Sequence, residues 1–233
     1  MNILTNNLLF GVVVSLIAFE AGLFIYRKTK FPLFNPLLIA ILLVIGFLVV
    51  FNIDYDVYNK GGKFINMFLG PATVVLALPL YKQLQLLKKY IMPILIGIFV
   101  GSSVSIVAVI FLSYLFGLDK VITISLIPKS VTTPIGIEIS NQLGGLEPVT
   151  VLAIIFSGIV GAIISPLLCK VFKIKNNIAV GLALGTSSHA IGTTKALEFG
   201  ETEGAMSSLS IGLAGIMTVF LAPIFFKMFS FLM

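Results

Sequence analysis

The sequence predicts an all-α polytopic membrane protein with about seven to eight transmembrane segments, some of them broken or re-entrant. Hydrophobic residues make up 58% of the chain and charged residues 10%, with a mean hydropathy of +1.15. Soluble domains carry about 25% charged residues, so this composition is typical of an integral membrane protein. The apolar stretches approach the roughly 20 residues that a spanning helix needs. Polar clusters interrupt some of them, and irregular backbone at membrane depth is tolerated only inside protein or beside water.

The apolar stretches form eight segments. In chain order they run approximately from Leu8 to Tyr26, Pro36 to Phe51, Phe64 to Leu80, Ile91 to Phe116, Val121 to Leu143, Val149 to Phe172, Ile178 to Leu197 and Met206 to Phe231. Between the second and third segments, the polar residues Asn52 to Lys63 predict a loop. Pro128 and Pro134 interrupt the fifth segment and predict a helix, a break and a second helix. No polar stretch is long enough to fold separately, so we expect a single domain over residues 1–233.

The net charge of +6 indicates orientation in the membrane rather than nucleic-acid binding, because the basic residues form short clusters between apolar segments. With Arg27 to Lys30 and Lys82 to Lys89 inside, the amino terminus lies outside. Lys170 to Lys175 also falls inside only if the fifth segment enters and leaves on one side. The carboxyl terminus with Lys227 is then expected in the cytoplasm.

This topology is compatible with an inverted repeat. Asn35 to Gly46 resembles Glu147 to Gly158, and Gly70 to Thr73 can be aligned with Gly185 to Ser188. The paired segments would run in opposite directions, as inverted repeats do in secondary transporters. An alignment of Gly70 to Thr73 with Ile127 to Ser130 is nearly as good, so both pairings stay open.

The break in the fifth segment carries Lys129 between Pro128 and Ser130. A buried ammonium needs an anionic partner or water, and a transported carboxylate would supply one. In the equally supported alternative, Lys129 extends to the membrane interface. Thr132 and Thr133 could bind the same anion, or they could satisfy helix backbone near the prolines.

Residues 185–195 form the most polar stretch within an apolar segment and contain the only histidine of the chain. Polar groups at membrane depth usually line a cavity or a pathway. His189 could move a proton or contact a substrate, or it could be a satisfied structural group. Lys195 either belongs to the site or pairs with Glu198 at an interface. The candidate binding residues of this stretch are Thr186, Ser187, Ser188, His189, Thr193 and Thr194.

Six residues are candidates for structural breaks: Gly70, Pro71, Pro128, Pro134, Gly185 and Gly192. For the glycines, close helix packing is the alternative explanation. Glu138, an isolated acid within an apolar segment, is a candidate for proton coupling, or else it pairs with a structural lysine. For Glu20 we favour a structural pairing with Arg27 or Lys28.

Motifs of catalysis and cofactor binding are missing from the sequence. There is no nucleotide-binding glycine loop, catalytic triad or metal-ligand spacing. The single Cys169 excludes an internal disulfide. We therefore expect no enzymatic activity, no cofactor, no metal and no nucleic-acid partner.

Three motifs in order resemble the LrgB/CidB family of bacterial membrane proteins: Gly70 to Lys82, Pro128 to Pro134, and Gly185 to Ala196. The resemblance covers nearly the whole chain. It implies a multi-pass protein of the bacterial inner membrane that acts with a small LrgA/CidA-type membrane partner. Lipid, a small organic anion and further copies of the chain in a homo-oligomer are the other expected partners.

The resemblance implies two kinds of activity. Family members are labelled antiholin-like proteins that modulate murein hydrolase activity and autolysis, whereas plastid relatives export glycolate and glycerate, and bacterial relatives are linked to pyruvate uptake. Because lysines and hydroxyls occur at the predicted breaks, we favour a transporter of small monocarboxylates of the pyruvate, glycolate or glycerate class. The alternative is an antiholin-like regulator of murein hydrolases and autolysis, or a holin-like pore.

Overall fold

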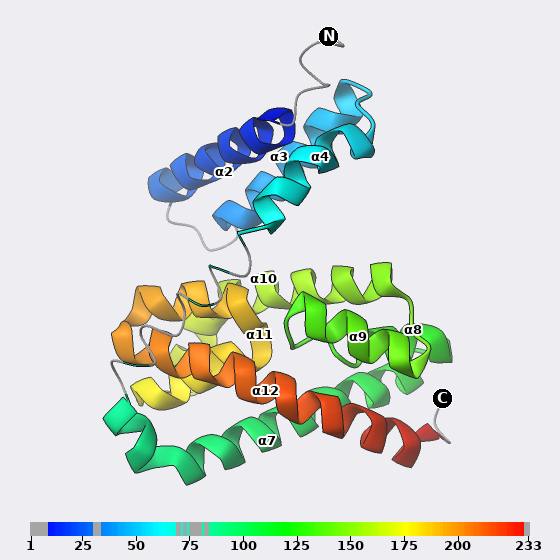
Figure 1. Cartoon of the computed structure of the whole chain (residues 1–233). Helices are drawn as coiled ribbons and strands as arrows, with labels where there is room; N and C mark the ends of the chain where they lie inside the picture. Colours follow the sequence, from blue (N-terminus) through cyan, green and yellow to red (C-terminus); the bar gives the residue numbers. More distant parts are fainter. Residues whose placement is uncertain are drawn as a thin grey trace. The chain divides into compact units, whose positions relative to one another are not determined.

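The computed structural model describes residues 9–29, 34–68, 71, 74, 81 and 84–230 (Figure 1). Its described secondary structure consists of helices and turns, which confirms the all-α prediction. The chain divides into two compact units, residues 1–75 and 76–233. Each unit is described by itself.

Among the described residues, four helices are long and apolar enough to cross a membrane: α2 (Leu9–Thr29), α7 (Leu84–Leu115), α10 (Glu147–Val171) and α12 (Glu201–Met228). A shorter apolar helix, α3 (Pro36–Val50), has 15 residues. The described residues therefore do not confirm seven to eight spanning segments. Most of the expected third segment, Phe64 to Leu80, lies outside them, and so does Gly70.

The first unit packs α2 against α3 and against a third helix, α4 (Tyr55–Asn66). The predicted loop from Asn52 to Lys63 is therefore wrong, because α4 begins at Tyr55. Its polar residues fall on one face, while Gly61 of the other face lies against the Gly11 backbone of α2. The Tyr58 hydroxyl lies 2.8 Å from the Ser15 hydroxyl. This amphipathic pattern at helical spacing distinguishes α4 from a loop.

The fifth apolar segment of the sequence is two short helices in the second unit. Helix α8 (Lys120–Leu126) ends before Pro128, and α9 (Thr133–Leu143) begins with Pro134 in its first turn. Residues 127–132 between them are not helical. This confirms the predicted helix, break and helix.

Helix α11 (Asn177–Phe199) is a hairpin rather than a straight helix. Its backbone breaks at His189, where φ is 42° and ψ is −134°. Gly192 lies against the carbonyl of Leu184, and Ala196 packs with Val180 and Leu184. Residues eight apart in a straight helix are about 12 Å apart, so the second arm runs back along the first. The arms have lengths of about 18 Å and 15 Å, and each is too short to cross a bilayer core of about 30 Å.

Helix α12 packs closely along the α11 hairpin. Gly181 lies against the backbone carbonyl of Glu203, and Gly185 lies against that of Ser207. The Thr193 and Ser207 hydroxyls lie 2.7 Å apart and are both buried. Small residues allow the two backbones to approach, as they do in membrane helix pairs. Gly185 is thus a packing residue, and the break itself occurs four residues later, at His189.

Candidate functional site

Lys129 lies in the break between α8 and α9, where its side chain reaches towards α7. Its Nζ donates to the hydroxyl of Ser105 at 3.3 Å and to that of Ser130 at 3.2 Å, and these hydroxyls lie 2.9 Å from each other. Within the described residues, no carboxylate lies within 4.0 Å of this ammonium. A half-buried cation held only by neutral hydroxyls retains the capacity to bind an anion.

Two serines that the sequence did not single out position Lys129. Ser105, on α7, contacts the ammonium. Ser157, on α10, donates its hydroxyl to the main-chain carbonyl of Lys129 at 2.7 Å. A serine in an apolar helix often bonds only its own backbone, so only the fold identifies these two.

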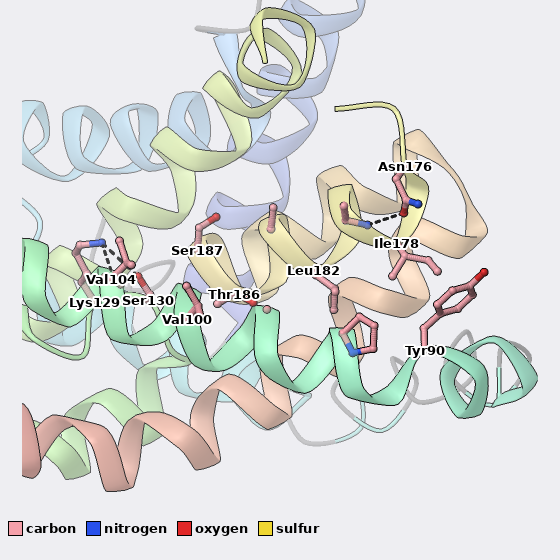
Figure 2. Close-up of a pocket in the computed structure, with 16 residues that line it drawn as sticks. Tyr90, Val100, Val104, Lys129, Ser130, Asn176, Ile178, Leu182, Thr186 and Ser187 are labelled. Carbon is pink, nitrogen blue, oxygen red and sulfur yellow. Dashed lines mark hydrogen bonds between the residues drawn. The ribbon is translucent and has the colours of Figure 1, made fainter. Parts of the chain in front are cut away.

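Two cavities meet at Lys129. Cavity A, of about 760 Å³, is lined by α7 from Tyr90 to Ser105, by Lys129 and Ser130, and by the first arm of α11 (Figure 2). Cavity B, of about 540 Å³, is lined by Lys129, by α10 from Phe156 to Phe172 and by the same arm. Lys129, Ala183 and Ser187 line both cavities.

Opposite faces of the first arm of α11 line the two cavities. Ile178, Leu182 and Thr186 face cavity A, whereas Val180, Leu184 and Ser188 face cavity B. Two residues correspond to about 200° around a helix, so these stripes lie on opposite sides. The predicted binding residues Lys129, Ser130, Thr186, Ser187 and Ser188 are therefore brought together around this arm.

Three buried hydroxyls of the second unit have no hydrogen-bond partner among the described residues. They belong to Thr186, which lines cavity A, and to Ser102 and Ser103 on α7. Thr186 is 8% exposed and Ser102 is 4% exposed. An unsatisfied buried hydroxyl costs about 1–3 kcal/mol. The Thr186 hydroxyl has almost no accessible surface, so it would donate to a ligand in cavity A only after its side chain rotates.

His189 marks the tip of the α11 hairpin and lies against α10. Its Nε2 lies 2.9 Å from the carbonyl oxygen of Ile154. A Cβ at Gly158 would fall 2.8 Å from the ring, so the glycine makes room for the imidazole. His189 lines neither cavity. The geometry thus supports the structural interpretation of His189, as a satisfied group that anchors the hairpin.

The remaining predicted binding residues lie away from both cavities. Thr132 and Thr133 are half-buried at the start of α9. Thr193 is bonded to Ser207 and to the His189 carbonyl, and Thr194 is exposed and bonds its own helix at Ile191.

The structure also shows where the charged candidates and the candidates for structural breaks lie. Glu138 is exposed on α9 and accepts a hydrogen bond from Gln142. Lys195 pairs with Glu198 at 2.6 Å, as the interface alternative predicted. Gly192 is a packing residue against the first arm, and Pro71 is helical and exposed. The described residues contain no group of three or more His, Cys, Asp or Glu suited to a metal ion.

Comparison with known proteins covers almost the whole chain. Residues 15–228 match the LrgB-like family. The antiholin-like protein LrgB of Bacillus subtilis (strain 168) is 43% identical over 94% of this chain and 95% of its own length. That of Bacillus mycoides (strain KBAB4) is 44% identical over 93% of this chain and 94% of its own length. No solved structure shows a significant match.

Proposed function

This chain belongs to the LrgB-like family, and from that premise we propose that it is an antiholin-like membrane protein that restrains murein hydrolase activity and autolysis. The proposal is supported by 43–44% identity to antiholin-like LrgB proteins over at least 93% of the chain. A small membrane protein of the LrgA/CidA type is its proposed partner, and the bacterial inner membrane is its proposed location. The proposal also includes a homo-oligomeric assembly.

Autolysis in cells tests this proposal. A strain that lacks the gene should lyse faster in detergent and release more murein hydrolase activity than its parent. Expression of this chain should slow lysis towards the parental rate, and expression together with the partner should slow it more. An unchanged lysis rate in the deletion strain with and without the partner would contradict the regulatory proposal.

A second function, transport of small monocarboxylates, is favoured by one observation. Lys129 presents an ammonium at the meeting point of two cavities, and no carboxylate of the described residues pairs with it. Lys129, Ser130 and Thr186 would bind the carboxylate, and the hydroxyls of Ser105 and Ser187 would extend the site. The rest of the cavity wall is mainly apolar. One cation in such a wall suits a single negative charge, because a second carboxylate would be buried without a partner.

Uptake into proteoliposomes tests the transport proposal. Labelled pyruvate and glycolate should enter by a saturable process, whereas succinate, with two carboxylates, should enter at least about tenfold more slowly because its second charge is desolvated. Equal rates for the three acids would contradict a site with one cation. A holin-like pore would instead release enclosed dye without saturation.

The orientation of the second unit forms part of the proposal. Lys88, Lys89, Lys173 and Lys175 support a cytoplasmic location for the end where α7 and α11 begin and α10 ends. The sequence predicted a cytoplasmic carboxyl terminus on the assumption that the segment of α11 crosses the membrane. If α11 instead returns as a hairpin to the side from which it entered, α12 carries the carboxyl terminus outwards. The proposed location of the amino terminus remains outside.

A further inference from the structure

Both cavities extend from Lys129 towards the same end of the second unit. Cavity A follows α7 back from Ser105 to Tyr90 and also includes Asn176. Cavity B follows α10 from Ser157 to Phe172. Asn176 follows Phe172 by four residues, so the two cavities approach the end where α10 stops and α11 starts. Figure 2 shows cavity A between Lys129 at one limit and Tyr90 with Asn176 at the other.

Beyond Ser105, α7 continues into a buried apolar cluster of the second unit. A cluster that we call the apolar plug consists of Ile106, Val109, Ile110, Ile127, Ile139, Leu221 and Ala222. None of its members is more than 8% exposed. Ile106 directly follows Ser105, and Ile127 lies two residues before Lys129, so the plug begins next to the groups that hold the ammonium.

The plug comes from four elements of the second unit. α7, the break after α8, α9 and the last third of α12 each contribute residues. Phe225, Phe226 and Phe229 pack around it. A constriction of branched aliphatic side chains offers no group to replace the hydration shell of an ion, and hydrophobic constrictions therefore block conduction.

We propose that the Lys129 site is open in this conformation only to the end of the second unit where α7 and α11 begin and α10 ends, and that the apolar plug is the barrier towards the opposite side. This inference rests on the proposed transport function, in which Lys129 holds the carboxylate. The plug is the structure that must separate for the anion to leave on the other side. It also explains how a protein with a deep polar site avoids a continuous leak.

A thiol probe at the site tests the barrier directly. Cys169 is the only cysteine of the chain, so Cys169→Ser with Ser187→Cys gives one thiol on the wall shared by both cavities. A membrane-impermeant sulfonate thiol reagent is added to inside-out and to right-side-out vesicles. We expect modification from the cytoplasmic face alone. Modification from the outer face at an equal rate, with the plug intact, would overturn the proposal.

Two isoleucines of α7 provide a matched pair of variants in the same single-thiol protein. Ile110 is 1% exposed and lies in the plug, whereas Ile94 is 0% exposed and lies in a separate cluster near the start of the helix. Ile110→Ser should hydrate the plug and cause a loss of one-sided modification. Ile94→Ser should keep modification one-sided at a similar cost in stability. If both folded variants remain one-sided, the plug is ordinary core and the assignment is wrong.

Pyruvate uptake in the parent vesicles separates failure of this inference from failure of the transport proposal. Saturable pyruvate uptake together with modification from both faces would support transport but contradict the assignment of the barrier to the apolar plug. One-sided modification without pyruvate uptake would contradict the transport proposal but would still support a site that is closed on one side. If Ile110→Ser does not fold, the single-thiol protein with an unchanged plug still tests whether the site is accessible from one face only.

Discussion

The Nε2 of His189 lies 2.9 Å from the carbonyl oxygen of Ile154, at the tip of the α11 hairpin. One turn further along α10, Ser157 donates to the carbonyl of Lys129 at 2.7 Å. A single turn of α10 therefore holds both broken segments of the second unit. The two breaks therefore share one support on α10.

Ser157→Ala tests this shared support. The substitution removes the hydrogen bond to the Lys129 carbonyl and should lower the free energy of unfolding by about 1 kcal/mol. Ser165→Ala is the matched control, because the Ser165 hydroxyl bonds only the Ala162 carbonyl of its own helix. Denaturant unfolding in detergent measures both. Equal losses for the two variants would show that Ser157 has no special part in holding the break.

Two substitutions at His189 separate backbone strain from the ring contact. The residue has a positive φ in a region that costs a non-glycine residue about 1–3 kcal/mol. Both His189→Ala and His189→Gly remove the bond to Ile154, but only glycine relieves the strain. Glycine also costs about 0.4–1 kcal/mol through unfolded-state entropy. His189→Gly should therefore be about 1 kcal/mol more stable than His189→Ala by the same unfolding measurement. An alanine variant at least as stable as the glycine variant would rule out strain at the tip.

Gly185→Ala should separate the first arm of α11 from α12. A Cβ at Gly185 would fall 2.9 Å from the carbonyl carbon of Ser207, and this backbone atom cannot rotate away. Overpacking of this kind costs about 1–3 kcal/mol. Gly212→Ala on α12 meets nothing within 4 Å and should stabilise the helix by about 0.5–1 kcal/mol. Losses of similar size in both variants would contradict close packing at Gly185.

The location of the carboxyl terminus tests the role of the α11 hairpin. If the hairpin returns to the side where α10 ends, a phosphatase fused after residue 233 should be active, because that enzyme functions only outside the cytoplasm. A fluorescent protein fused at the same position should be dark. If α11 crosses the membrane, the two reporters should give the opposite result.

The sequence predicted the break that carries Lys129, because its prolines and polar residues are local signals. Proline alone does not mark a break, since Pro93, Pro166 and Pro223 lie within helices. In α11 the break occurs at His189, between the two glycines that the sequence proposed. The sequence did not predict that α11 folds back on itself. The fold-back depends on Gly192 meeting Leu184, and on the fit of α11 against Gly158 and α12. The last two are contacts with other helices, which a local pattern does not reveal.

The sequence singled out only part of the residues that line the two cavities. Lys129, Ser130, Thr186, Ser187 and Ser188 converge around the first arm of α11. Glu138 and Thr194 lie on exposed surfaces, because the face that a helical residue presents depends on its neighbours. Ser105 and Ser157 were missed, since a serine in an apolar helix often bonds only its own backbone. The helix α4 was missed because a short amphipathic helix resembles a polar loop in composition.

Uptake of labelled pyruvate by liposomes that contain Lys129→Ala, Lys129→Arg or the parent protein tests most directly whether Lys129 is the anion-binding group. The parent should show saturable uptake. Lys129→Ala should lose at least about tenfold in kcat/KM, because a hydrogen bond to a charged group contributes about 1.5–3 kcal/mol. Lys129→Arg should retain part of the activity, and all three proteins should insert equally. Equal uptake by the parent and Lys129→Ala, or parental uptake no greater than that of empty liposomes, would contradict the assignment.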